Sequence, residues 1–360
     1  SHIVAVTNEF RHDLAYKMNR LIPKIEQLDN SYSKILLELN LDAPHTFNGL
    51  KIIIDLLNCV GAAHTIPFEW ITLNETQKLY EEIDFCANSK LKIVELTTEL
   101  KKEFSFILLN DDSISVSSVD NLKSRILFED EKEKLISYIT NREPFLYWSS
   151  DKIDIVTEYI GIAKDVSKRI KTLEAELLDI YEPSVFELDY RGILARIKTE
   201  YNSIFKVFKK SYRNDKKTIM LHHKGFAKKV SDEEMIFLVE TLKKINEEKQ
   251  WYQENAGILG RLFGREKISE ETEYSAFEKQ IKIFIAINNA IETIEKIVHI
   301  FGELEREEAL LQTNFKFLYN GIFSDWDLIR KSLDWAILFK NIVAKVNASE
   351  RFIKSVCENG

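Results

Sequence analysis

The sequence predicts an all-α protein made of long helices that pack against one another. Residues that interrupt helices are scarce: the 360 residues include 11 glycines and 5 prolines, and no proline follows Pro183. An interior proline costs a helix about 3 kcal/mol, so this scarcity favours helices over loops. Apolar residues recur at spacings of three and four, the period of a helix. We therefore expect elongated antiparallel helical hairpins or coiled coils together with a smaller helical bundle.

The N-terminal helix is the clearest single element. Its apolar residues form a heptad seam, which is the pattern of a coiled-coil face. The seam consists of Leu14, Met18, Leu21, Ile25, Leu28, Tyr32, Ile35 and Leu39. Pro23 lies inside the seam, so we expect a kink or a break there, and Asp42-Ala43-Pro44 is expected to end the helix.

Further amphipathic helices are predicted up to the last proline. They cover roughly residues 50–60, 76–109, 119–140 and 151–181. Two long amphipathic helices joined by a short return favour an antiparallel hairpin. Residues 1–182 are therefore interpreted as one long helical hairpin or coiled-coil arm.

The helical pattern continues to the C-terminus. Ser231 and Glu234 fit a capping box, and the three glycines of residues 257–264 predict a bend between two helices. The predicted helices cover roughly residues 188–212, 231–256, 272–300 and 324–346. We divide this part into a basic aromatic helical segment at 183–230 and C-terminal helices at 231–360 that pack back on the arm.

The sequence contains no recognisable catalytic or metal-ligating pattern. Residues 260–264 form a stretch one residue too short for a phosphate-binding Walker loop. The three cysteines are far apart and odd in number, which indicates neither a disulfide framework nor a zinc site. The adjacent His222 and His223 point in different directions on a helix, unlike metal ligands. We therefore expect a non-enzymatic chain with no cofactor or metal of its own.

Hydropathy and cysteine usage bear on location. We find no run of about 18 or more uncharged apolar residues and no secretory signal, so we expect no membrane partner. Free cysteines are typical of a reducing compartment. The expected location is the cytoplasm.

The strongest functional signal is a basic segment at residues 191–229. Twelve lysines and arginines stand there against only Glu200 and Asp215, a local net charge of +10 in a chain whose total is −8. Such asymmetry is typical of a surface that binds phosphate groups. The candidate phosphate contacts are Arg196, Lys206, Lys209, Lys210, Arg213, Lys216, Lys217, Lys228 and Lys229.

Aromatic residues alternate with these cations, and the pattern has three interpretations. In the first, Tyr201 and Tyr212 stack on unpaired bases while the cations follow the nucleic-acid backbone. In the second, the same tyrosines join Phe205 and Phe208 in a core stripe, because the four recur at spacings of four, three and four, and the cations merely face water. In the third, the basic face docks on an acidic protein surface.

Several motifs resemble those of large bacterial superfamily I DNA/RNA helicases of the Upf-like, AAA-domain type. One is the stretch RIKTEYNSIFKVF at 196–208, with YRND at 212–215 and KVSDEE at 229–234 after it. The others are NGIFSDWD at 320–327 and LDWA at 333–336, which are similar to the family's "G-x-x-T/S-D-W" and "L-x-W-A" signatures. The likeness covers nearly the whole chain.

The resemblance implies a helical insertion, or stalk, within the first motor domain of such a helicase. ATP and magnesium then belong to the parent protein only, and the partners are DNA or RNA and the parent's motor domains. Either Ser324 or Asp325 is expected to cap a helix, and Trp326 and Trp335 to pack in the core. For Asp325 and Trp326 the other interpretation is that they belong to a functional surface. The alternative is a coiled-coil spacer or protein-interaction arm with no nucleic-acid contact, which self-associates through its heptad seams.

Overall fold

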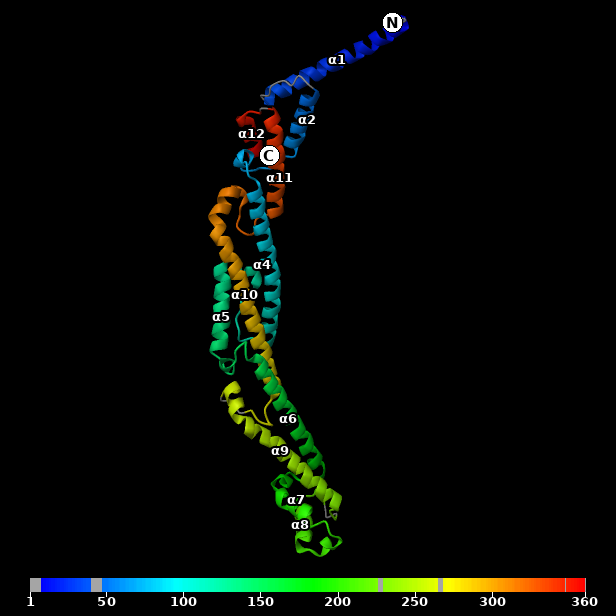
Figure 1. Cartoon of the computed structure of the whole chain (residues 1–360), viewed down its shortest axis with the longest axis vertical. Helices are drawn as coiled ribbons and strands as arrows, with labels where there is room; N and C mark the ends of the chain where they lie inside the picture. The colour runs from blue at the N-terminus through cyan, green and yellow to red at the C-terminus, as the bar shows by residue number, and fades with distance from the viewer. Residues whose placement is uncertain (1–7, 40–46, 226–228, 265–267, 347, 360) are drawn as a thin grey trace. The chain divides into compact units, whose positions relative to one another are not determined.

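We analysed a computed structural model of the chain, which describes residues 8–39, 47–225, 229–264, 268–346 and 348–359 (Figure 1). The predicted all-α class is confirmed, because these residues form α-helices and short 3₁₀ helices (η) and no β-strand. The α-helices are α1 (Asn8–Leu39), α2 (Phe47–Gly61), α3 (Glu69–Thr72), α4 (Gln77–Asn110), α5 (Arg125–Thr140), α6 (Ile153–Ile180), α7 (Tyr190–Thr199), α8 (Lys210–Leu221), α9 (Asp232–Phe263), α10 (Tyr274–Phe315), α11 (Trp326–Val346) and α12 (Glu350–Asn359). The 3₁₀ helices are η1 (Val119–Asn121), η2 (Phe145–Tyr147), η3 (Pro183–Glu187), η4 (Ile204–Phe208) and η5 (Lys316–Leu318).

The helices divide between two compact units. Unit 1 comprises Ser1–Glu95 and His299–Gly360, and unit 2 comprises Leu96–Val298. This differs from the predicted division at residues 182 and 230. The reason is that each of the long helices α4 and α10 contributes to both units, so no boundary falls in the loops where composition had suggested one.

In unit 1, α11 packs against α2 and α3 around large buried aromatic residues. The indole of Trp70 donates a hydrogen bond to the Asn314 carbonyl at 2.8 Å and meets the Phe315 ring edge-on. Burying two aromatic rings while satisfying the indole N–H is what holds a short helix such as α3 in place.

The heptad seam of α1 is exposed from Leu14 to Leu28, whereas Tyr32 is half-buried. The helix runs through Pro23 without interruption, so a break at that position is wrong. Leu14, Leu21 and Ile25 are all exposed. Coiled-coil packing of this seam therefore stays a prediction.

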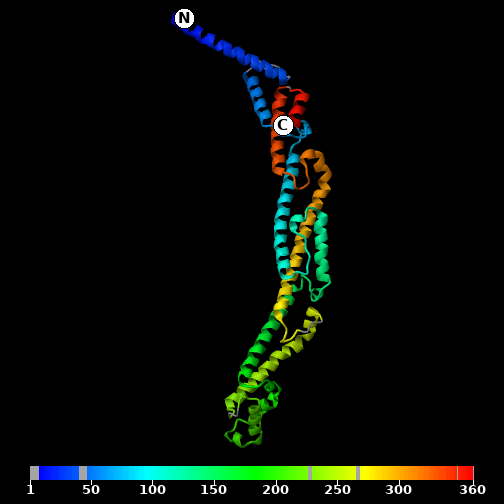
Figure 2. The same ribbon diagram turned by 180° about the vertical axis from the view of Figure 1, so that it is seen from behind.

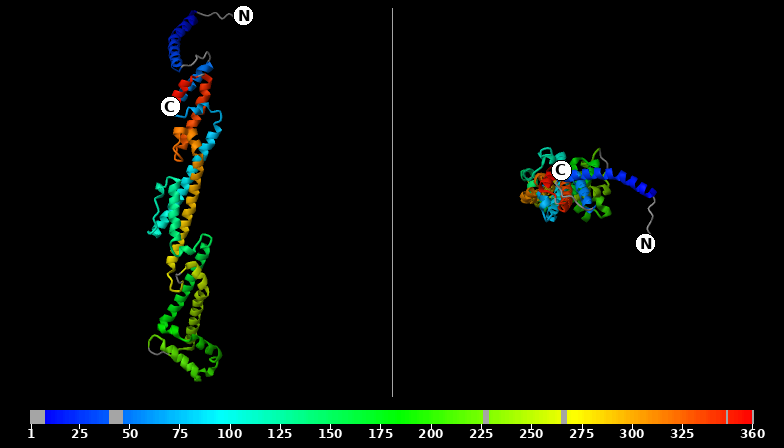
Figure 3. Two further views of the ribbon diagram at one scale, coloured as in Figure 1. Left: turned by 90° about the vertical axis from the view of Figure 1, so that its left-hand side faces the viewer. Right: turned by 90° about the horizontal axis from the view of Figure 1, so that it is seen from above.

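Unit 2 is built on the antiparallel pair α6 and α9, which Figure 3 shows side by side. The Tyr252 hydroxyl donates a hydrogen bond to the Ala163 carbonyl at 2.7 Å, and the Arg169 guanidinium forms two bonds with Glu248 at 2.8 and 2.9 Å. Helix α5 lies beside α10 (Figure 2), where the Lys132 ammonium is 3.5 Å from Glu295. The result is a layer of paired helices that carries α7 and α8 at the end where α6 stops and α9 starts (Figure 1).

Several predicted boundaries differ from the structure. The helix predicted over 119–140 is η1 followed by α5, and the one predicted over 272–300 is α10, which continues to Phe315. Helix α9 continues past two of the predicted bend glycines and ends at Phe263, followed by Gly264 at φ +67°, a left-handed conformation that glycine adopts without strain. The helix predicted over 188–212 is instead α7, η4 and α8. The capping box at Ser231 and Glu234 is confirmed. The division of residues 188–212 into α7, η4 and α8 creates the candidate site.

Candidate nucleic-acid interface

Asp215 holds α7 against α8. The Arg196 guanidinium donates two hydrogen bonds to the Asp215 carboxylate, both at 2.8 Å, and the Tyr201 hydroxyl donates a third at 2.6 Å. Asp215 itself is buried. A two-pronged guanidinium bond to a carboxylate is strong and directional, and it raises the pKa of Arg196 above its usual value. The predicted continuous helix breaks here because Tyr201 turns inward to reach this carboxylate.

Asp232, the first residue of α9, gathers a second cluster. Its carboxylate lies 2.5 Å from the Lys206 ammonium and 2.7 Å from the Lys216 ammonium, and it accepts a hydrogen bond from the Tyr212 hydroxyl. Burial alone would raise the pKa of Asp232. The hydrogen bonds from Lys206, Lys216 and Tyr212 outweigh burial and hold the pKa below its usual value. Asp232 therefore ties η4 and α8 to the start of α9.

Tyr201 and Tyr212 lie in the core of this region. Both are buried, and their rings pack edge-to-face with centroids 5.2 Å apart. Burial and the bond to Asp215 raise the pKa of Tyr201, so its hydroxyl stays protonated. Neither ring has a face open to a base, and the expectation that these two residues stack on nucleic acid is corrected accordingly.

The candidate cations separate into two groups. Arg196, Lys206 and Lys216 are each paired with a carboxylate and so take part in the fold, and a phosphate contact by them stays a prediction. The Lys209 ammonium donates to the Glu200 carbonyl at 3.0 Å. Lys228 lies outside the described residues, and Lys229 is exposed.

The second group forms a stripe along α8, which we call the α8 stripe: Lys210, Arg213 and Lys217. Spacings of three and four place these residues on one face of the helix, and all three are exposed. The opposite face carries the buried Tyr212, Asp215 and Ile219. None of the three stripe cations forms an ion pair with a residue that the structure describes. Their positive charge therefore faces solvent.

The 3₁₀ helix η4 presents apolar side chains to solvent immediately before the stripe. Phe205 is 65% exposed and Phe208 is 75% exposed, and Ile204 and Val207 are exposed as well. We call Phe205 and Phe208 the η4 pair. Their exposure contradicts the interpretation in which Phe205 and Phe208 join Tyr201 and Tyr212 in a core stripe, which assumed one continuous helix over 188–212. The signal for a break in that helix was Ser203, whose hydroxyl accepts a bond from the Phe205 N–H at 3.1 Å and caps the turn.

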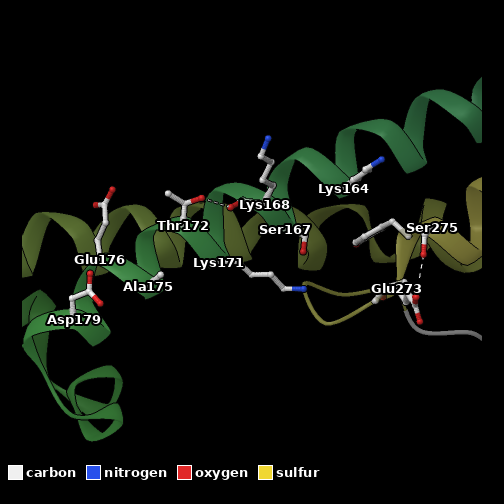
Figure 4. A pocket seen from close by; sticks show the side chains of 12 residues that line it. Lys164, Ser167, Lys168, Lys171, Thr172, Ala175, Glu176, Asp179, Glu273 and Ser275 are labelled. Carbon is white, nitrogen blue, oxygen red and sulfur yellow. Dashed lines mark hydrogen bonds between the residues drawn. The ribbon is translucent and has the colours of Figure 1, made fainter.

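Two grooves in unit 2 contain further lysines. One has a volume of about 750 Å³ and lies between α6 and residues 272–275. Figure 4 shows Lys171 extending from α6 toward the segment that carries Glu273. Lys164 in this groove is paired with Glu278 at 2.6 Å. Because acidic and basic groups are mixed here, the groove has no single charge preference. Another groove, of about 440 Å³, lies between α7 and α9 and is more basic, because Arg191, Lys198 and Lys243 line it with one carboxylate, Glu247.

In unit 1 the "S-D-W" and "L-D-W" residues take part in the fold. The Asp325 carboxylate accepts the Leu328 N–H at 3.0 Å at the start of α11. The Trp326 indole donates to the Ile322 carbonyl at 3.2 Å, and the Trp335 indole donates to the Cys59 carbonyl at 2.9 Å. Both indoles are buried, which is the geometry of a helix cap followed by core packing.

Among the described residues, no three His, Cys, Asp or Glu side chains converge as metal ligands, and no helix is long and apolar enough to cross a bilayer. No family model, no curated protein and no solved structure matches the chain.

Proposed function

We propose that this chain is an accessory helical insertion of a superfamily I helicase and that it contacts nucleic acid through the α8 stripe. The observation that carries the proposal is that some cations of this region pair with carboxylates and others face solvent. Asp215 pairs with Arg196, and Asp232 pairs with both Lys206 and Lys216. Lys210, Arg213 and Lys217 remain as a row of cations on one face of a rigid helix.

A row of this kind suits a phosphate backbone. Lysine and arginine side chains that contact phosphates release condensed counterions, so binding is independent of sequence and falls steeply with salt. The insertion itself has no catalytic role in this proposal. ATP hydrolysis belongs to the parent protein's motor domains, and the stripe couples nucleic-acid contact to them. The support for the helicase assignment is the resemblance of residues 196–234 and 320–336 to that family.

A second candidate function is a spacer that binds another protein. The exposed seam of α1 favours it, since an uncovered heptad face is what a partner helix packs against. In that case the α8 stripe docks on an acidic protein surface and has no affinity for nucleic acid.

Fluorescence anisotropy with labelled single-stranded and duplex oligonucleotides, repeated over a salt series, tests the proposal. The triple variant Lys210→Glu, Arg213→Glu and Lys217→Glu should weaken binding and reduce the slope of log affinity against log salt by roughly two to three. A matched control reverses three exposed lysines of α10, Lys279→Glu, Lys282→Glu and Lys296→Glu. Equal losses from both triples would mean that only net charge matters. No binding by the wild type at low salt would transfer the assignment to the spacer.

A further inference from the structure

The η4 helix exposes its apolar side chains, while its lysine, Lys206, pairs with a carboxylate of the fold. A 3₁₀ helix has three residues per turn, so residues three apart lie above one another. Within η4, Ile204 therefore lies above Val207 and Phe205 above Phe208, while Lys206 occupies the third face and the extended Lys209 follows the helix. Lys206 is half-buried beside Asp232, and Lys209 is exposed but donates to the Glu200 carbonyl, whereas the two apolar pairs face solvent.

Specific contacts hold η4 in this orientation. The Lys206 ammonium lies 2.5 Å from Asp232, and the Lys209 ammonium donates to the Glu200 carbonyl at 3.0 Å. The Ser203 hydroxyl caps the preceding end. A turn free to rotate would bury its phenylalanines and release its lysines to water, because apolar burial is favourable and lysine burial is not. The exposure of the rings is thus built into the local structure.

The spacing of the two rings matches the geometry of an unpaired strand. At about 2.0 Å rise per residue, Phe205 and Phe208 start roughly 6 Å apart along the helix axis. Successive bases in a stacked strand are about 3.4 Å apart, so two rings at this separation leave room for one base between them. Phenylalanine has no hydrogen-bonding group, so it offers only its flat face, which fits any base.

The charges beside the rings select the same ligand. The α8 stripe begins at Lys210, two residues after Phe208, and continues along the helix that follows η4. Aromatic rings next to a row of cations are the combination that binds single strands, in which bases stack on the rings and phosphates follow the cations. In a duplex the base faces are already covered by their neighbours, and the rings have nothing to contact.

We infer that Phe205 and Phe208 stack on unpaired bases and that this interface therefore prefers single-stranded over duplex nucleic acid. The inference rests on the proposed function and specifies its ligand. It replaces the buried Tyr201 and Tyr212 with two rings whose faces are open.

The test uses the full chain with oligonucleotides that carry 2-aminopurine, whose fluorescence reports stacking, and compares single strands with duplexes. In the variant Phe205→Leu with Phe208→Leu the apolar character stays and the rings are removed. Single-strand affinity should fall by roughly five- to 150-fold for each stacked base lost, while duplex affinity stays unchanged. Phe317→Leu, at a comparably exposed phenylalanine of unit 1, is the control and should change neither.

The outcomes separate this inference from the proposal on which it rests. If the α8 charge reversal weakens binding but the leucine variant does not, or if the leucine variant weakens single strands and duplexes equally, stacking is overturned and the phosphate contact stands. If only the leucine variant weakens binding, stacking stands and the role of the α8 stripe falls. If the wild type binds neither oligonucleotide but binds vesicles of anionic phospholipid, both are overturned and η4 is a membrane-surface contact.

Discussion

Two clusters of aromatic residues in unit 2 have opposite surroundings. Around Trp148, the rings of Phe145, Phe263 and Phe284 lie with centroids 5.5 to 6.3 Å away, and the indole donates to the Leu262 carbonyl at 2.8 Å. On η4, by contrast, Phe205 and Phe208 contact solvent over most of their surface. The first cluster stabilises the fold and the second does not contribute to the core.

The difference between them is decided by neighbouring polar groups. The Trp148 cluster is enclosed by helices α9 and α10, and its one polar hydrogen finds a backbone acceptor. At η4 the residues that find partners are lysines, because Lys206 pairs with Asp232 and Lys209 donates to the Glu200 carbonyl. Where aromatic residues alternate with cations, hydrophobicity alone does not decide which residues are exposed. The outcome depends on whether the aromatic side chains or the cations find bonding partners within the fold.

The largest change in the free energy of unfolding is expected at the buried Trp148 cluster. Trp148→Ala removes a buried ring system and an indole hydrogen bond, so the free energy of unfolding should fall by about 3–5 kcal/mol. Urea-induced unfolding followed by circular dichroism measures the loss, and hydrogen exchange assigns it to unit 2. Trp251→Ala, at a half-buried tryptophan of α9, is the control. Equal losses at the two sites would show that the Trp148 cluster has no special part in the core.

An intermediate change in the free energy of unfolding is expected at Asp232, which anchors η4 through Lys206. The folded-state pKa of Asp232 lies below its unfolded value of about 3.9, so its stabilisation is fully present above that value and is lost as pH falls through the lower folded pKa. Stability should therefore decline below about pH 4, and Asp232→Asn should flatten that decline while lowering stability at pH 7. Urea unfolding at a series of pH values provides the measurement.

The control for this titration is Asp120→Asn, which removes an exposed partner of Lys101. Solvent and salt screen an exposed ion pair, so the decline with pH should persist in this variant. A wild-type stability that is level from pH 7 to pH 3 would contradict the role given to Asp232.

The smallest effect is expected at the η4 pair. Replacing both rings, Phe205→Ser with Phe208→Ser, should change the free energy of unfolding by no more than about 0.5 kcal/mol, because exposed side chains contribute little to the core. The same urea experiment measures it. A loss comparable to that of Trp148→Ala would mean that the rings are buried in solution, and the contrast between the two clusters would disappear.

Much of the fold follows from local pattern. The helix predicted over residues 76–109 is α4 (Gln77–Asn110), and the one at 324–346 is α11 (Trp326–Val346). Long amphipathic helices are readable because a period of three to four residues repeats many times. The errors fall where the pattern is short, as at residues 188–212, or where a glycine is tolerated within a helix, as in α9.

The sequence by itself determined the all-α class, the long helices and the concentration of positive charge at residues 191–229. These properties depend on composition and on neighbours a few positions apart. Only the tertiary structure decided which cations remain open to a ligand and which rings face solvent. That choice depends on contacts such as Tyr201 with Asp215 and Lys206 with Asp232, which join residues 14 and 26 positions apart on different elements. No local periodicity encodes such pairs, because the carboxylate that neutralises a cation is chosen by how the helices pack.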